Sequence, residues 1–207
     1  MITAITVRSI ENREEWERFC LSHPLPQFMQ AWDAGLLMQD MGEEILRLGI
    51  FVDTALVGVC LASIVRARRG TYLYAPYGPV LQEWKIEYLH ALTAALKQHG
   101  GKEKADFIRL APFLERTEAH LKLLAETGYR VAPIHMLAES LWLLDLADKD
   151  EATLLADMSK TTRYSIKRAA KDGVEIRQTH NQNDLNTFLQ LDDLTKERHH
   201  FTPYPDK

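Results

Sequence analysis

Cysteine is scarce in this sequence, and the few histidines do not fall in metal-binding patterns. The two cysteines, Cys20 and Cys60, lie among apolar neighbours without the spacing of a disulfide framework. A reducing compartment is the simpler interpretation. No two of the eight histidines have the HxxxH or HExxH spacing of a zinc site. The sequence therefore indicates neither a disulfide scaffold nor a metal protein.

Long apolar runs are also missing. The longest, Ala55–Val65, is about half of the roughly 20 residues that a membrane-spanning helix needs. Its Val, Ile and Cys content is typical of a buried strand. Met1–Asn12 has no sustained apolar core of the kind found in a secretory signal. We therefore expect a cytoplasmic protein with no integral membrane segment.

An excess of positive charge is absent too, because the formal net charge is −4. This excludes a globally basic nucleic-acid coat, so any anion-binding site must be a local patch. The hydrophobic content of 46% and the charged content of 26% are ordinary for a globular protein, which leaves enough apolar residues for a sizeable core.

The apolar periodicity of the first 148 residues predicts a mixed α+β fold. Helices are expected at 14–20, 30–41, 85–99 and 116–126, and strands at 45–52, 56–66, 71–74, 106–110, 129–131 and 140–146. The first three strands should form an antiparallel meander. Ala75–Pro79 should be a shaped loop, and Gly100-Gly101 should end the third helix.

This order of elements resembles the acetyltransferase-like (GNAT) fold, an α/β domain with a central, mostly antiparallel sheet flanked by helices. A charged linker, Asp148–Glu151, follows. Beyond it the pattern predicts helices at 152–158, 161–171 and 183–200 and a strand at 174–177. Such a unit cannot bury its own apolar face. We therefore expect a first GNAT-like domain at 1–148 and the truncated beginning of a second at 149–207.

The segment Met158–Arg177 concentrates basic charge. On a helix, four of its cations fall near one face at spacings of three or four: Lys160, Arg163, Lys167 and Lys171. Such a stripe suits the repeated charges of a phosphate backbone. The alternative is a solvated helix face of no special function.

Four segments resemble motifs of Fem-type peptidyltransferases, and they occur in the family's order. Met-Ser-Lys-Thr-x-Arg-x-x-Ile-x-x-Ala-x-x-x-Gly-Val, from Met158, resembles the signature that opens the second lobe of these enzymes. Phe28–Trp32 resembles the early Leu-Gln-Ser-x-x-Trp helix start, and Tyr74–Val80 resembles Tyr-x-Pro-x-Gly-Pro. Thr195-x-x-Arg198-x-x-Phe201 resembles Thr-x-x-Arg-x-x-Phe. The resemblance thus spans nearly the whole chain.

The resemblance implies an aminoacyltransferase that moves an amino acid from aminoacyl-tRNA to the peptide stem of a peptidoglycan precursor, without a cofactor. The precursor would be a UDP-linked or lipid-linked muropeptide, and the lipid-linked form would bring the protein transiently to the inner face of the membrane. Arg198 would grip the precursor phosphates, with Thr195 and Tyr204 as neighbours. The four stripe cations are candidates for tRNA binding. No catalytic residue is identified.

The sequence departs from the family pattern at two places. Met38 stands where the family usually has a lysine that also binds the precursor, and no basic residue occurs between Arg18 and Arg47. Tyr77 stands where the family often has arginine. Either the precursor is held differently here or the early helix aligns in another register.

Two other functions are open from the sequence. An acyl-CoA-dependent N-acyltransferase would share the fold, but the Gln/Arg-x-x-Gly-x-Gly/Ala turn that cradles the CoA pyrophosphate is missing. The nearest match, Gln98–Gly101, is expected to end a helix instead of opening one. The other alternative is a non-catalytic RNA-binding protein that keeps the basic stripe.

Overall fold

The computed structural model describes residues 4–25, 27–68 and 70–200. The chain divides into two units, here called unit 1 (residues 1–140) and unit 2 (residues 141–207). The boundary predicted at 148 thus falls inside unit 2. That unit 2 begins a second GNAT-like domain stays a prediction.

Unit 1 is built on a mixed six-stranded sheet in the order β1-β2-β3-β4-β6, with β5 paired to β3. The strands are β1 (Ile5–Ser9), β2 (Glu44–Val52), β3 (Ala55–Ala67), β4 (Gly70–Tyr77), β5 (Val80–Leu81) and β6 (Phe107–Pro112). The predicted β2–β3–β4 meander is confirmed, because its neighbours pair antiparallel. β6 adds to β4 in parallel, and β1, which was not predicted, pairs with β2.

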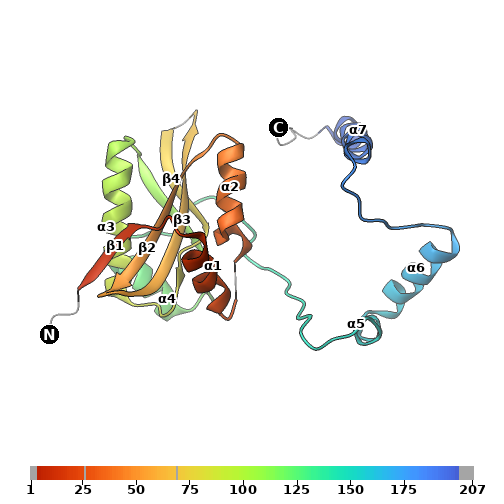
Figure 1. Ribbon diagram of the computed structural model, residues 1–207, viewed down its shortest axis with the longest axis horizontal. Coiled ribbons are helices and arrows are strands. Elements are labelled where there is room, and N and C mark those ends of the chain that lie inside the picture. The colour runs from red at the N-terminus through yellow and green to blue at the C-terminus, as the bar shows by residue number, and fades with distance from the viewer. Residues whose placement is uncertain (1–3, 26, 69, 201–207) are drawn as a thin grey trace. The chain divides into compact units, whose positions relative to one another are not determined.

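Helices cover both faces of this sheet (Figure 1). One side holds α1 (Arg13–Ser22), the short η1 (Phe28–Gln30) and α2 (Trp32–Asp40). An apolar cluster there takes Trp16 and Cys20 from α1 and Trp32 and Met38 from α2. The other side is covered by α3 (Ile86–Lys102), with Leu89, Leu92 and Leu96 buried, and by α4 (Glu118–Glu126). The predicted mixed α+β class with a helix-flanked sheet is therefore confirmed.

The central strand β3 is apolar along most of its length because both of its faces are covered. Val59 and Leu61 belong to the cluster under α1 and α2, whereas Cys60 and Ala62 belong to the cluster under α3. Successive side chains of a strand point to opposite faces, so β3 buries the unbroken run Val57–Ile64 between the two helical layers.

Two predictions in unit 1 that relied on glycine or proline to end an element are wrong. The third helix does not end at Gly100-Gly101 but continues to Lys102. Gly100 is buried in the last turns of α3, and a Cβ there would make only ordinary contacts, 3.5 Å from Ala105 and 3.6 Å from Leu73. β4 likewise continues through Ala75 and Pro76 to Tyr77, where a loop was expected. Its pairing with β6 holds it extended there.

The strands predicted at 129–131 and 140–146 are also wrong, because these residues lie in irregular segments. Trp142 is 95% exposed. In the part of the chain that the structure describes, the sheet ends at β6, so neither segment has a strand beside it. Apolar content alone therefore gave a false strand signal.

Unit 2 contains the three predicted helices, α5 (Glu151–Asp157), α6 (Lys160–Lys171) and α7 (Gln182–His199). Each begins after a residue whose side chain accepts a hydrogen bond from a backbone N–H of the first turn: Asp150, Ser159 and Asn181. The strand predicted at 174–177 is wrong, and Ile176 there is 97% exposed. No helix in the described ranges is both long and apolar enough to cross a membrane.

Burial in this three-layer core should make both thiols unreactive in the folded protein. Desolvation raises the pKa of Cys20 and of Cys60 to about 12, with a smaller contribution from the charge of Glu17 at Cys20. Only the thiolate reacts readily, so at pH 8 we expect negligible labelling by Ellman's reagent until the protein unfolds. Titrating the thiols with and without urea measures this. Prompt labelling of two thiols in the absence of urea would contradict the buried positions.

Candidate functional site

The side-chain amide of Gln30 lies between β3 and β4 where these strands separate. Its Nε2 donates to the carbonyl oxygens of Leu61 (3.0 Å) and Pro76 (2.8 Å), and its Oε1 accepts from the Leu61 N–H (2.8 Å). The ladder between the strands ends at the Ser63–Tyr74 pair. Continued by two residues, it would set Leu61 opposite Pro76. The amide therefore takes the place of the missing strand partner.

A side chain is needed at this point because Pro76 has no N–H to donate across the ladder. Gln30 itself is 0% exposed, and its backbone carbonyl accepts a hydrogen bond of 2.7 Å from Trp16 Nε1 on α1. A Cβ at Gly78 would lie 2.6 Å from the Gln30 amide, so only glycine leaves room for it. One residue thus joins α1, β3, β4 and the turn after β4.

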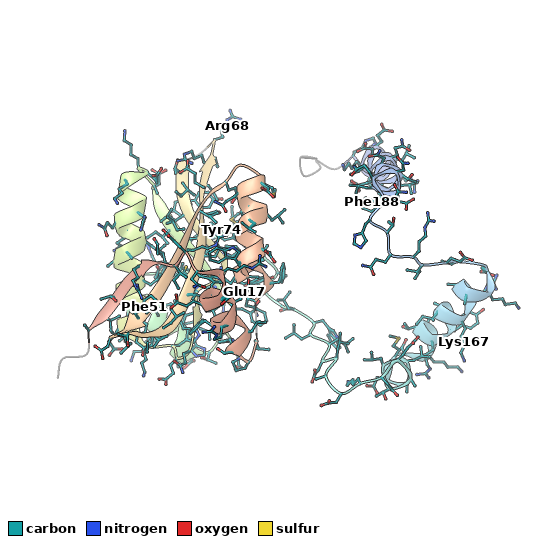
Figure 2. The ribbon with its side chains drawn as sticks, viewed as in Figure 1. Glu17, Phe51, Arg68, Tyr74, Lys167 and Phe188 are labelled. Carbon is teal, nitrogen blue, oxygen red and sulfur yellow. The ribbon has the colours of Figure 1, made fainter. Side chains whose placement is uncertain are left out.

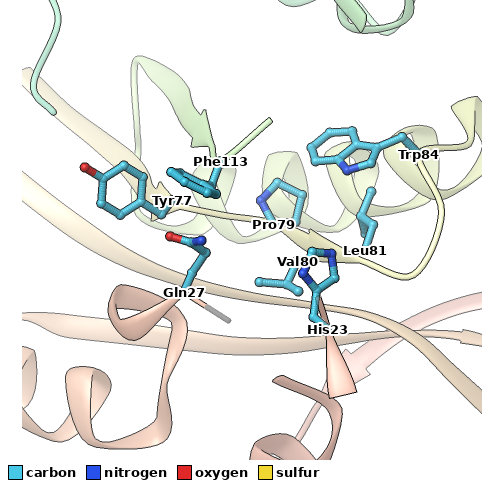
Figure 3. Close-up of a pocket in the computed structure, with 8 residues that line it drawn as sticks. All are labelled: His23, Gln27, Tyr77, Pro79, Val80, Leu81, Trp84 and Phe113. Atoms are coloured by element: carbon cyan, nitrogen blue, oxygen red, sulfur yellow. The ribbon is translucent and has the colours of Figure 1, made fainter. Parts of the chain in front are cut away.

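That turn borders a small cavity, shown in Figure 3. Tyr77 has a positive φ of 49°, and the Gly78–Pro79 peptide is cis. The cavity has a volume of about 10 Å³ and is lined by His23, Gln27, Tyr77, Pro79, Val80, Leu81, Trp84 and Phe113. Such a volume holds about one water molecule. It is too small for a substrate.

Tyr77 contributes its ring to an aromatic cluster. Its ring makes edge contacts with Phe28 (centroids 6.2 Å apart) and Phe113 (5.7 Å). Edge-to-face contacts of this kind stabilise packing. The turn is therefore held by aromatic packing, with no cation from its central residue.

The early helix has no cation at Met38, but a cation from β2 lies close to it. Met38 packs against the apolar cluster that contains Trp16. The Arg47 guanidinium lies 4.0 Å from the centre of the Trp32 ring and donates a hydrogen bond of 3.1 Å to the Trp32 carbonyl. Burial lowers the pKa of Arg47. Sequence reasoning missed this residue because it belongs to the following strand.

The basic stripe of α6 separates into two kinds of residue. Lys160, Lys167 and Lys171 are exposed, and no carboxylate within the described ranges lies at ion-pair distance from them; Lys167 is labelled in Figure 2. Arg163 instead donates to the carbonyls of Ala156 (2.9 Å) and Met158. These carbonyls belong to the end of α5, whose last turn has no helical donors of its own. Arg163 therefore closes α5 through its Nη1, and the three lysines are the stripe cations without such a bond; the tRNA-binding role of all four stays a prediction.

Two further side chains of α6 lie on or beside the stripe. Arg168 Nε donates to Asp172 Oδ2 at 2.7 Å, and hydrogen bonds to Asp172 and then Tyr164 raise the pKa of Arg168. Tyr164 is 64% exposed. Sequence reasoning did not single out this tyrosine, although its spacing from Lys160 and Lys167 was a usable signal.

The predicted precursor-binding residues lie at the end of α7. Thr195 and Arg198 are three residues apart and so share a helix face. Thr195 Oγ1 donates to the Leu191 carbonyl at 2.9 Å, and the Arg198 side chain is exposed in the last turn. Tyr204 lies outside the described residues. Their binding role stays a prediction.

No cluster of three or more His, Cys, Asp or Glu side chains that could hold a metal ion occurs within the described ranges. Of the site residues predicted from the sequence, the structure describes exposed cations on α6 and α7. Such cations can bind anionic substrates.

Comparison of the sequence with models of known protein families identifies a match to the FemAB family. The FemAB family model matches residues 12–125 and 127–204. None of the curated proteins matches the chain. Among solved structures, FemX is similar with a TM-score of 0.77 and 22% identity, over 96% of this chain and 51% of that chain. The present chain therefore spans about half the length of FemX.

Two further solved structures are similar to part of the chain at low identity. A transcriptional regulator from Bacillus halodurans C-125 has a TM-score of 0.50 and 10% identity, over 67% of this chain and 100% of that chain. Glucosamine-6-phosphate N-acetyltransferase from Arabidopsis thaliana has a TM-score of 0.46 and 11% identity, over 65% and 97%.

Replacing Gln30 should destabilise unit 1. Gln30→Leu leaves the Leu61 N–H and the Leu61 and Pro76 carbonyls buried without their partner, which we expect to cost about 2–4 kcal/mol of unfolding free energy. Gln98→Leu, on the exposed side of α3, should change it by less than about 0.5 kcal/mol. Urea unfolding followed by circular dichroism measures both. Equal midpoints for Gln30→Leu and the wild type would refute the bridging role.

Proposed function

The chain belongs to the FemAB family, and we propose that it acts as an aminoacyltransferase on a peptidoglycan precursor. The donor would be aminoacyl-tRNA and the acceptor amine would lie on the peptide stem of a UDP-linked or lipid-linked muropeptide. The observation that carries the proposal is the extent of the family match, which includes the Gln30 segment, α6 and α7.

The proposed aminoacyl transfer depends mainly on how the two substrates are positioned. The amino acid on tRNA is already activated as an ester, so the acceptor amine must be held against its carbonyl carbon. The amine attacks, the ester C–O bond breaks, and the tRNA hydroxyl leaves with the proton that the amine loses. Both substrates carry phosphates. Exposed cations at Lys160, Lys167, Lys171 and Arg198 would supply binding for them.

Transfer from acyl-CoA is disfavoured by the start of α3. In a GNAT-like fold, an anionic pyrophosphate is best held by a glycine-rich turn at a helix N-terminus. Here α3 begins at Ile86 after Lys85, with no side-chain cap. Glu83 and Glu87 lie beside the first turn and would repel a pyrophosphate. Lys85 is already paired with Glu83 at 2.6 Å.

The donor is a cytoplasmic molecule, so we place the reaction in the cytoplasm. A lipid-linked acceptor would bring the protein transiently to the inner face of the membrane. The test is incubation with radiolabelled aminoacyl-tRNA and either a UDP-linked muropeptide or its lipid-linked form. Label on the muropeptide supports the proposal. Label that stays on tRNA while acetyl-CoA is consumed against amines supports an acyl-CoA enzyme, and bound tRNA without turnover supports a non-catalytic RNA-binding protein.

Arg198 should contribute to binding of the muropeptide's pyrophosphate. Arg198→Ala removes a charge-assisted, bidentate contact. We therefore expect the affinity for the UDP-linked muropeptide to fall by roughly tenfold or more. Arg198→Lys keeps the charge but cannot make the bidentate contact, so its affinity should lie between those of the wild type and Arg198→Ala. Isothermal titration calorimetry measures the affinities, with Arg18→Ala, an exposed arginine of α1, as the matched control. Unchanged affinity in Arg198→Ala would remove this residue from the site.

A further inference from the structure

Tyr164 lies within the lysine stripe of α6. It follows Lys160 by four residues and precedes Lys167 by three and Lys171 by seven, so all four share one side of the helix. Its ring is 64% exposed, and Arg168, four residues further along α6, borders the same side. A large aromatic ring is thus held in water among unpaired positive charges.

The character of a partner for this side follows from those charges. Ile166 and Ala169 lie on the other side of α6 and give it an apolar face where protein can pack. A protein surface that covered Tyr164 would also desolvate the neighbouring lysines, for which the described residues supply no carboxylate. Burying unpaired charges is costly. A partner that brings both negative charge and a flat ring resolves the conflict.

RNA with an unpaired nucleotide is such a partner. Phosphates match the lysines, and a base outside a duplex offers a face on which an aromatic side chain stacks. Bases within a duplex are already stacked on one another and are not available. In aminoacyl-tRNA the unpaired nucleotides include the 3′ end, which carries the amino acid.

We infer that Tyr164 stacks on an unpaired nucleotide at the 3′ end of the tRNA, while Lys160, Lys167 and Lys171 hold the adjoining phosphates. This inference rests on the proposed function and assigns the part of the RNA that α6 contacts. We leave Arg163 out of these contacts, because its Nη1 is bonded to two carbonyls at the end of α5.

The experiment compares two fluorescent RNA hairpins with the same stem, one blunt and one with a short unpaired 3′ overhang. Binding to the full chain is followed by anisotropy. We expect Tyr164→Ala to weaken binding of the overhang hairpin roughly 5- to 150-fold and to leave the blunt one unchanged. Tyr164→Phe keeps the ring and should bind nearly as the wild type does. Phe188→Ala, which removes another exposed ring from unit 2, is the matched control and should have no effect.

The salt dependence of RNA binding should distinguish the contribution of the lysines from that of the Tyr164 ring. Binding of both hairpins should depend less on salt when Lys160, Lys167 and Lys171 are changed to Gln. The plot of log association constant against log salt concentration should become less steep by roughly 0.7–0.9 per lysine. Tyr164→Ala should leave that slope unchanged. Equal losses on both hairpins, or none, in Tyr164→Ala would overturn the stacking. If the wild type binds neither hairpin and no aminoacyl-tRNA, the proposed function itself fails.

Discussion

The packing of unit 1 depends on one side-chain amide that completes a sheet where the backbone cannot. Pro76 lacks the N–H that would continue the ladder from β4 to β3, and the Gln30 amide bonds to both Leu61 and Pro76 in its place. Because the donor comes from η1, the helical layer on that face is fixed to the sheet by the same bonds. Trp16 attaches α1 to the same residue. An apolar residue could fill the volume but not pair these backbone groups, which are costly to leave unpaired.

This arrangement explains why the turn after β4 has no room for a substrate. The turn after β4 is closed by glycine against Gln30 and by the aromatic contacts of Tyr77 with Phe28 and Phe113, so its cavity is too small for a substrate. Arg47 is engaged with Trp32 by stacking and a hydrogen bond. The cavity beside this turn therefore gives a substrate no room, and the cations singled out for anion binding lie on α6 and α7 of unit 2.

The sequence predicted the parts of the fold that depend on local pattern and failed where distant residues decide. β2 and β3 have periods and turns that are readable within a short window, and both were predicted. The extension of β4 through Pro76 was not, because its support comes from Gln30, 46 residues away in sequence, and from the parallel strand β6. The false strand around Trp142 shows the converse. An apolar run becomes a strand only where another strand pairs with it.

The candidate site shows the same limit at the level of single charges. Helical spacing placed Lys160, Arg163, Lys167 and Lys171 on one face, and spacing alone treats them as equal. The short step from α5 to α6 makes them unequal, because a planar guanidinium with several donors can satisfy two carbonyls at the end of α5, whereas an exposed ammonium stays hydrated. Counting acidic and basic residues also passes over Tyr164, which is neither. Yet a ring among lysines is what distinguishes a surface able to hold an unpaired base from one that only attracts phosphates.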